Sequence, residues 1–215
     1  MAAPSSAVDI CNLALDQLKQ PVITSIDSPT TSAENLCARH YDMTRRALLR
    51  KHPWSFAKSR TALSRNATDP TFGYADAYDL PNDYLRLLFF GDDSIGNYQN
   101  LSKIFEIENG QILIDNSGAS ALNIGYMKDE TSVTEFDALF VQLFILELAV
   151  NMAYAFTLKN TLVKRLRDDL VDARNEARAI NGQERPIRRV ERSKFRGARQ
   201  SLFTNVAGKN TVFNE

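Results

Sequence analysis

The chain changes its hydrophobic spacing twice, and these changes divide it into parts. Apolar residues recur every three to four positions in residues 6–19 and 33–51, which predicts an amphipathic helix in each range. Residues 133–158 are apolar on nearly every side, and residues 161–180 are apolar on one side only. We therefore expect four helices, with the third buried among the others.

Start and stop signals support these helices. Pro21 and Pro53 follow the first and second ranges, and proline cannot continue a helix. Thr31 and Glu34 have the spacing of a capping box, in which each side chain bonds to the other residue's backbone N–H. The Asn181–Gly182 pair is typical of a C-terminal cap and predicts the end of the fourth helix.

Residues 54–130 have a different pattern, in which short β-branched and aromatic runs are separated by Gly, Asn, Asp and Pro. We expect strands in residues 55–63, 75–80, 84–90, 104–108, 111–115 and 121–128. Asn109-Gly110 suits a two-residue type I′ hairpin, because both central residues need a positive φ. The predicted fold class is α+β: an antiparallel bundle of about four helices with a small antiparallel β-sheet insertion and an extended C-terminal arm.

In this division, residues 1–52 and 131–183 form the helical core, residues 53–130 the β insertion, and residues 184–215 a basic arm. The 26 Lys and Arg residues equal the 26 Asp and Glu residues, so no overall field attracts nucleic acid or an anionic membrane. The arm differs, with eight basic and three acidic residues. We expect it to become ordered on a partner.

The third helical range is apolar enough to suggest a membrane span. Gln142, Glu147 and Asn151 interrupt it, and burying them in lipid costs several kcal/mol. We therefore predict a core helix and no membrane partner. Cys11 and Cys37 lie on the apolar sides of the first two helices, and we expect them to be small buried side chains and not a disulfide.

Candidate catalytic chemistry is sparse. His40 lies on the apolar side of its helix, where a core or interface role is favoured. Glu147 is the sharpest candidate, because a carboxylate among apolar neighbours can have a raised pKa. Without a catalytic partner, a hydrogen bond from Glu147 to another helix or subunit is the favoured interpretation. No phosphate-binding loop or metal-ligand spacing occurs, so we predict no enzyme activity, no cofactor and no metal site.

Segments in a fixed order carry a family resemblance. They are VDICNLALDQL (8–18), AENLCARHYDMTRRALLRKHPWSFAKSR (33–60), YADAYDLPNDYLRLL (74–88), and FEIENGQILID (105–115) with ALNIGYMKDET (121–131). In this order and spacing they resemble the head-to-tail adaptors of short-tailed bacteriophages, a family also called tail tubular protein A. The resemblance covers about residues 7–183 and does not extend into the arm.

The resemblance implies a structural function in the virion tail, after assembly in the host cytoplasm. Twelve copies would form a ring (a homo-oligomer) between the portal protein and a tail nozzle protein similar to tail tubular protein B. Genomic DNA would pass through this channel at ejection without specific binding. A conduit must not hold its cargo, and a chain without net charge suits that requirement.

Each implied contact has candidate residues. For the portal they lie in the arm: Arg185, Arg188, Arg189, Arg192, Lys194, Phe195, Arg196, Arg199, Leu202 and Phe203. For the contact between subunits, Arg45, Arg46 and Arg50 would face Asp168, Asp169 and Asp172, and for the nozzle the candidates are Asp92, Asp93, Asn97 and Tyr98. Trp54 is better explained by burial where the sheet meets the helices than by an interface.

Two other functions remain open. The first is a nucleic-acid-binding module that uses the basic arm, which predicts an affinity that falls steeply with salt. The second is a tail accessory enzyme that degrades peptidoglycan, which requires two cooperating carboxylates.

Overall fold

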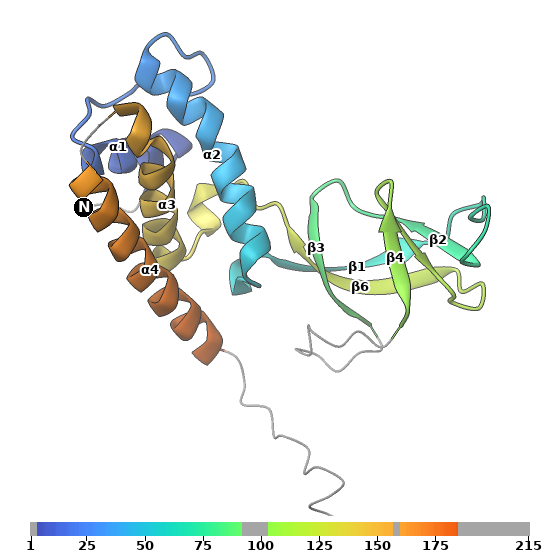
Figure 1. The fold of residues 1–215 in the computed structure, drawn as a ribbon. Coiled ribbons are helices and arrows are strands. Elements are labelled where there is room, and N and C mark those ends of the chain that lie inside the picture. The colour runs from blue at the N-terminus through green and yellow to red at the C-terminus, as the bar shows by residue number, and fades with distance from the viewer. Residues whose placement is uncertain (1–3, 92–102, 157–159, 185–215) are drawn as a thin grey trace, which may run out of the picture. The chain divides into compact units, whose positions relative to one another are not determined.

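The structure is a computed structural model that describes residues 4–91, 103–156 and 160–184 (Figure 1). The chain divides into two compact units, Met1–Asn181 and Gly182–Glu215, and every strand among the described residues belongs to the first. The candidate portal residues of the arm lie outside the described residues, as do the candidate nozzle residues Asp92, Asp93, Asn97 and Tyr98.

Four helices and six strands make up the described fold, in the order of the predicted segments. The helices are α1 (Ala7–Gln17), α2 (Ser32–Lys51), α3 (Ala138–Phe156) and α4 (Asn160–Gln183). The strands are β1 (Lys58–Ser64), β2 (Asp76–Asp79), β3 (Tyr84–Phe90), β4 (Phe105–Glu108), β5 (Gln111–Ile114) and β6 (Ala121–Lys128), and short 3-10 turns cover Ser55–Ala57 and Val133–Glu135. The predicted α+β fold class is confirmed.

The capping box at the start of α2 forms as predicted. The Thr31 hydroxyl accepts from the Glu34 N–H at 3.2 Å, and the Glu34 carboxylate accepts from the N–H groups of Thr31 at 2.9 Å and Thr30 at 2.8 Å. These hydrogen bonds, that from the Thr30 backbone first, lower the pKa of Glu34 to about 2. The folded state therefore favours a charged Glu34.

Two predicted helix ends are wrong. The third helix begins at Ala138 and not near Val133, because the Asp137 carboxylate accepts from the N–H of Leu139 at 2.8 Å and caps it there. The fourth helix continues past Asn181–Gly182 to Gln183. Asn181 is a buried helical residue whose side chain donates to the Ser55 hydroxyl at 3.0 Å, so it does not cap the helix.

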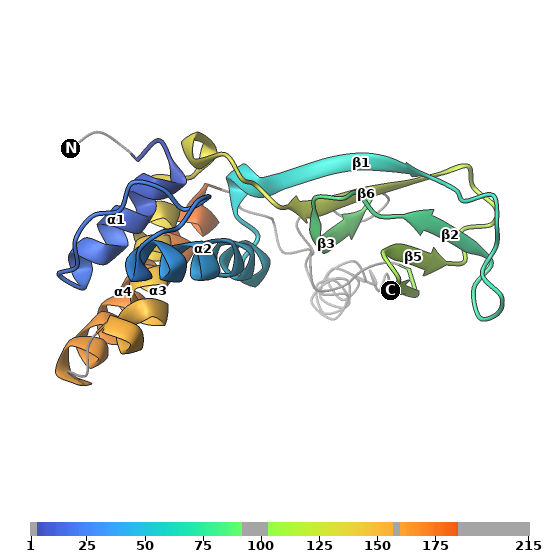
Figure 2. The same ribbon diagram turned by 90° about the horizontal axis from the view of Figure 1, so that it is seen from above.

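The strands form two three-stranded antiparallel sheets, where one small sheet was expected. The first has the order β1-β6-β3 and the second the order β2-β5-β4. Figures 1 and 2 show the long β1–β6 pair, which is in register from Lys58 opposite Met127 to Ser64 opposite Ala121. Asn109 and Gly110 turn β4 into β5 with φ values of 47° and 76°, as the hairpin prediction requires.

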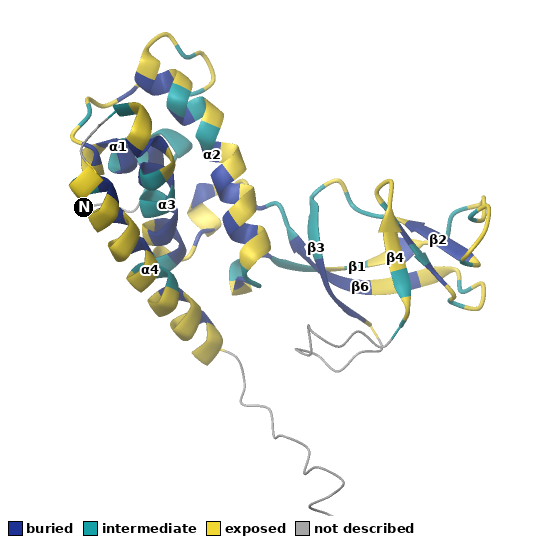
Figure 3. Ribbon diagram, viewed as in Figure 1, coloured by how far each residue is buried: buried dark blue, intermediate teal, exposed yellow. Residues whose placement is uncertain are grey.

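Two hydrophobic cores result. The larger lies among the helices and includes the fully buried Phe140, Phe144 and Leu148 of α3 (Figure 3). The smaller joins the two sheets, since it contains Ile124 of β6 together with Ile112 of β5. Each sheet is therefore buried on one side against the other.

Helix α3 has the length and apolarity of a membrane span, which is weak evidence on its own. In the structure it packs in the larger core, and its polar side chains have partners. Asn151 donates to the Thr44 hydroxyl at 2.9 Å, and Glu147 bonds to two cations. These contacts agree with the predicted core helix. Cys11 and Cys37 are buried and free, as predicted.

Trp54 closes the larger core where α2 leads into β1. The indole is 1% exposed, and its N–H donates to the Leu48 carbonyl at 3.0 Å. Its ring meets that of Phe140 edge to face at 5.1 Å. The predicted buried role of Trp54 is confirmed.

Gly125 lies in the middle of the first sheet, opposite Arg60 of β1 and Phe89 of β3. The Phe89 ring occupies the space above it, so that a Cβ at position 125 would come within 2.1 Å of a ring carbon. The Arg60 guanidinium lies 5.5 Å from the centre of the same ring. A glycine here allows one aromatic ring to cover the middle strand.

We predict that Gly125→Ala destabilises the fold, because the Phe89 ring must leave its position to admit a methyl group. The expected loss is about 1–3 kcal/mol of unfolding free energy, measured by urea denaturation. Gly182→Ala is the matched control, since nothing lies within 4 Å of its added Cβ and its site is helical. The control should be neutral or slightly stabilising, and equal losses in both variants would contradict the packing argument.

We also predict that Glu34 makes the free energy of unfolding depend on pH below about 4.5. Its pKa is about 2 in the folded state against an ordinary value of 4.5, so its contribution is complete above pH 4.5. It is lost as the pH falls from 4.5 towards 2. Urea midpoints measured across this range should fall more steeply for the native chain than for Glu34→Gln. The exposed Glu176→Gln is the control and should follow the native chain.

Candidate interaction site

The basic side of α2 bonds to this chain's own residues. Arg45 is buried, pairs with Asp129, and donates to the Glu130 carbonyl at 2.6 Å. Arg46 bonds to the other Asp129 oxygen at 2.7 Å. Arg50 donates to the Leu85 carbonyl at 2.7 Å. This side of α2 is therefore attached to the end of β6 and to β3.

These bonds correct part of the predicted contact between subunits. Arg45 does not offer its charge to another copy, because its side chain is 3% exposed and its donors are used internally. Arg46 and Arg50 are exposed but also bonded internally. On α4, the candidate acidic residues Asp168, Asp169 and Asp172 are all exposed, and Asp169 lies 3.8 Å from Arg165. Their contact with another subunit stays a prediction.

Glu147 connects three helices. Its carboxylate accepts from Lys51 of α2 at 2.8 Å and from Arg174 of α4 at 2.9 Å. Burial alone would raise the pKa of Glu147, but the two cations outweigh it and lower the pKa. The raised pKa considered from the sequence is therefore wrong, and the predicted hydrogen bond to another helix is confirmed.

The edge of the second sheet is formed by β4. Within the described residues, β4 pairs with β5 alone, and most of the strand is exposed (Figure 3). Antiparallel bonding alternates from the Glu108–Gln111 pair that closes the hairpin. The N–H and C=O groups of Phe105 and Ile107 therefore point outwards.

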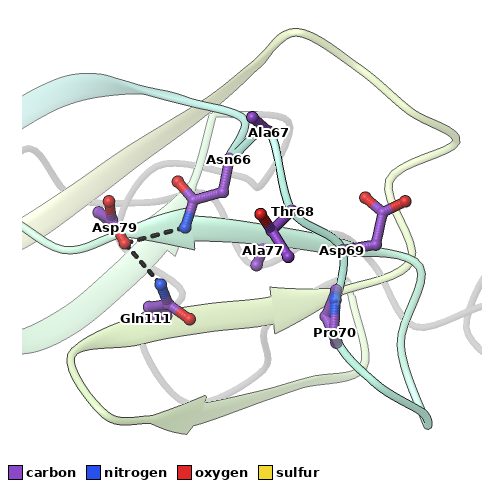
Figure 4. Close-up of a pocket in the computed structure, with 8 residues that line it drawn as sticks. All are labelled: Asn66, Ala67, Thr68, Asp69, Pro70, Ala77, Asp79 and Gln111. Carbon is purple, nitrogen blue, oxygen red and sulfur yellow. Dashed lines mark hydrogen bonds between the residues drawn. The ribbon is translucent and has the colours of Figure 1, made fainter.

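The outer side of this sheet is hollowed on both sides of Pro70. One hollow of about 440 Å³ is lined by residues that include Asn66, Asp79 and Gln111 (Figure 4). In it, the Asp79 carboxylate accepts from Asn66 at 2.9 Å and from Gln111 at 2.8 Å. The second hollow, of about 320 Å³, lies towards β4 and is lined by residues that include Phe72, Tyr74, Glu106 and Glu108.

Negative charge gathers on this side of the sheet. We call Asp79, Glu106, Glu108 and Asp115 the acidic face; all four are exposed. Burial raises the pKa of Tyr74, and the charges of Glu106, Asp115 and Glu108 raise it further. Glu106 and Glu108 have no ion-pair partner in the part of the chain that the structure describes.

Exposed apolar side chains lie beside the acidic face. Phe72 is 87% exposed in the loop that lines the second hollow, and Ile104 is 86% exposed immediately before β4. Large apolar side chains with this exposure, next to an unpaired strand edge, are typical of interaction surfaces. This site was not predicted from the sequence, although the alternation in Phe105–Glu108 places both glutamates on one side of the strand.

Within the described ranges, no group of three or more His, Cys, Asp or Glu side chains is placed to hold a metal ion. No protein-family model and no curated protein matches the chain.

We predict that Glu147→Gln lowers stability because it leaves Lys51 and Arg174 without their shared anion. The Glu147 side chain is only 13% exposed, so the loss should be about 1–3 kcal/mol by urea denaturation. Asp169→Asn is the matched control, because its pair with Arg165 is exposed and should change stability by about 0.5 kcal/mol or less. If both variants unfold at the same midpoint, Glu147 does not hold the helices together.

Proposed function

We propose that this chain is a structural head-to-tail adaptor, which forms a ring between the portal and the nozzle of a short-tailed phage. The observation that carries the proposal is the ordered resemblance of its segments to that family. The proposed partners are the portal protein, the nozzle protein and further copies of the chain. Genomic DNA would pass through the ring without specific binding.

Each resembling segment forms a defined piece of the fold. Residues 8–18 lie largely in α1, and residues 33–60 contain most of α2 and the Pro53–Trp54 junction. Residues 74–88 contain β2 and the start of β3, and residues 105–115 contain the Asn109–Gly110 hairpin. The resembling segments therefore contain residues that form the helices, strands and turns of the fold. This supports a shared fold with that family over a chance similarity of short sequences.

The charge distribution supports an assembly function. The chain has no net charge, although its arm has eight basic and three acidic residues. An arm of this kind suits binding to an acidic protein groove. The acidic face gives the rest of the chain a surface of the opposite sign, and the exposed side of α4 carries charges of both signs.

We propose that the arm docks onto the portal. Its candidate residues are those given by the sequence analysis, from Arg185 to Phe203. The arginines supply charge and bidentate hydrogen bonds to carboxylates, and Phe195, Leu202 and Phe203 supply apolar contacts.

We predict that deletion of residues 184–215 abolishes co-sedimentation of the chain with portal rings of the same virus on a sucrose gradient. Deletion of residues 1–3 is the control and should leave binding unchanged. Negative-stain images of the native mixture should show rings added to the portal. Unchanged binding by the arm deletion would remove the arm from the portal contact, and an absence of rings with intact portals would overturn the adaptor proposal.

The same arm deletion tests the nucleic-acid alternative. A DNA-binding arm would give an affinity whose logarithm falls steeply with the logarithm of salt concentration, and the deletion would remove it. The adaptor proposal expects weak DNA binding and little change. Strong, salt-dependent binding that disappears with the arm would favour the alternative.

A further inference from the structure

The edge of β4 is a place where another strand can pair. The backbone groups of Phe105 and Ile107 point away from β5, and no other described strand pairs with β4. Such an edge can accept an added strand, which then gains main-chain hydrogen bonds. The side chains decide which strand is accepted.

A second β4 is a poor partner for this edge. If two copies paired through β4, Glu106 and Glu108 of one copy would lie beside the same residues of the other. Like charges across a strand pair are destabilising, and natural sheets protect their edges in this way. The favoured partner is a strand with positive charges on one side.

The second hollow adds preference for arginine. Glu106 and Glu108 line it together with Tyr74 and the exposed Phe72. A guanidinium can bond to carboxylates and lie flat on an aromatic ring, which a lysine does less well. The hollow and the edge are adjacent because β4 contributes to both.

The chain's own arm contains a segment of this chemistry. In an extended strand alternate residues share a side, so Arg188, Arg192, Lys194 and Arg196 of residues 187–196 would lie together, with Val190 among them. The opposite side would be mixed, with Ile187 and Phe195 at its ends and Arg189, Glu191 and Ser193 between them. The segment lies between Pro186 and Gly197 and itself contains no proline or glycine, the residues that disfavour a strand. It therefore has the charge and the spacing that the acidic edge requires.

We propose that residues 187–196 of one copy add as a strand to β4 of a second copy, with their cations against Glu106 and Glu108. Each copy carries both a donor segment and an acceptor edge. The contact is therefore heterologous, and repetition of a heterologous contact produces a ring or an open chain.

This inference deepens the proposed function and rests on it only for the ring. It reassigns residues 187–196, which stand among the portal candidates of the proposed function, to a neighbouring copy, and it leaves Arg185, Arg199, Leu202 and Phe203 to the portal. Self-association can be measured without a portal. Failure of this inference would leave portal binding by the rest of the arm untouched, and failure of portal binding would leave this contact standing.

The test is donor–acceptor complementation in the full-length chain. The acceptor variant is Glu106→Lys with Glu108→Lys, and the donor variant is Arg188→Glu with Arg192→Glu. The control, Asp16→Lys with Glu176→Lys, makes the same charge change as the acceptor variant on exposed residues of α1 and α4 that belong to no proposed contact. Sedimentation velocity is measured over a concentration series at low salt, where surface charges are least screened.

We expect the native chain and the control to self-associate. The donor and acceptor variants should each self-associate at least tenfold more weakly, and an equal mixture of the two should form pairs again. A monomeric native chain, a control as weak as the acceptor variant, or no recovery on mixing would overturn the proposal.

One more variant tests the strand pairing itself. Ile107→Pro removes an outward N–H of β4 while leaving both glutamates, and an edge position tolerates proline because that N–H makes no bond within the sheet. We expect it to weaken self-association at least tenfold, with a circular dichroism spectrum like that of the native chain. Native-like association would show that charge alone holds the copies together and would overturn strand addition.

Discussion

The buried ion pair between Arg45 and Asp129 holds the β region to the helices. The chain enters this region at the end of α2 and leaves it at the end of β6, and Arg45 joins the two. Its guanidinium also donates to the Glu130 carbonyl, so a buried cation is met by a charge and by a backbone acceptor. Removing one partner of such a pair costs about 3–5 kcal/mol, because the remaining charge stays buried without compensation.

Much of the fold could be predicted because its signals are local. The capping box of Thr31 and Glu34 spans four residues, and the Asn109–Gly110 turn needs only two residues that tolerate a positive φ. The division into two sheets could not be predicted in the same way. It depends on β1 pairing with β6, far away in the sequence, and alternation within a strand does not specify its partner.

The candidate sites likewise depend on contacts between residues far apart in the sequence. In the sequence Glu147 has apolar neighbours, and burial among apolar residues predicts a raised pKa for its carboxyl group. Lys51 and Arg174 are 96 and 27 residues away, and their approach reverses the direction of the shift. The acidic face was missed for a similar reason, since the hollow beside Glu106 and Glu108 exists only after the 66–75 loop and β4 are brought together.

Zero net charge in this chain reflects separation of charges and not their absence. Arg45, Arg46 and Lys51 of α2 pair with acidic residues of the fold. Glu106 and Glu108 are left without an ion pair in the described part of the chain, and the arm carries an excess of arginine. Screening limits exposed charges to a range of about 8–10 Å at physiological salt, so each charged surface acts on the partner that approaches it. A charged partner is therefore attracted or repelled according to which of these surfaces it approaches. Two different surfaces that complement each other favour heterologous contacts, in which unlike faces of identical copies meet. A ring requires contacts of this kind.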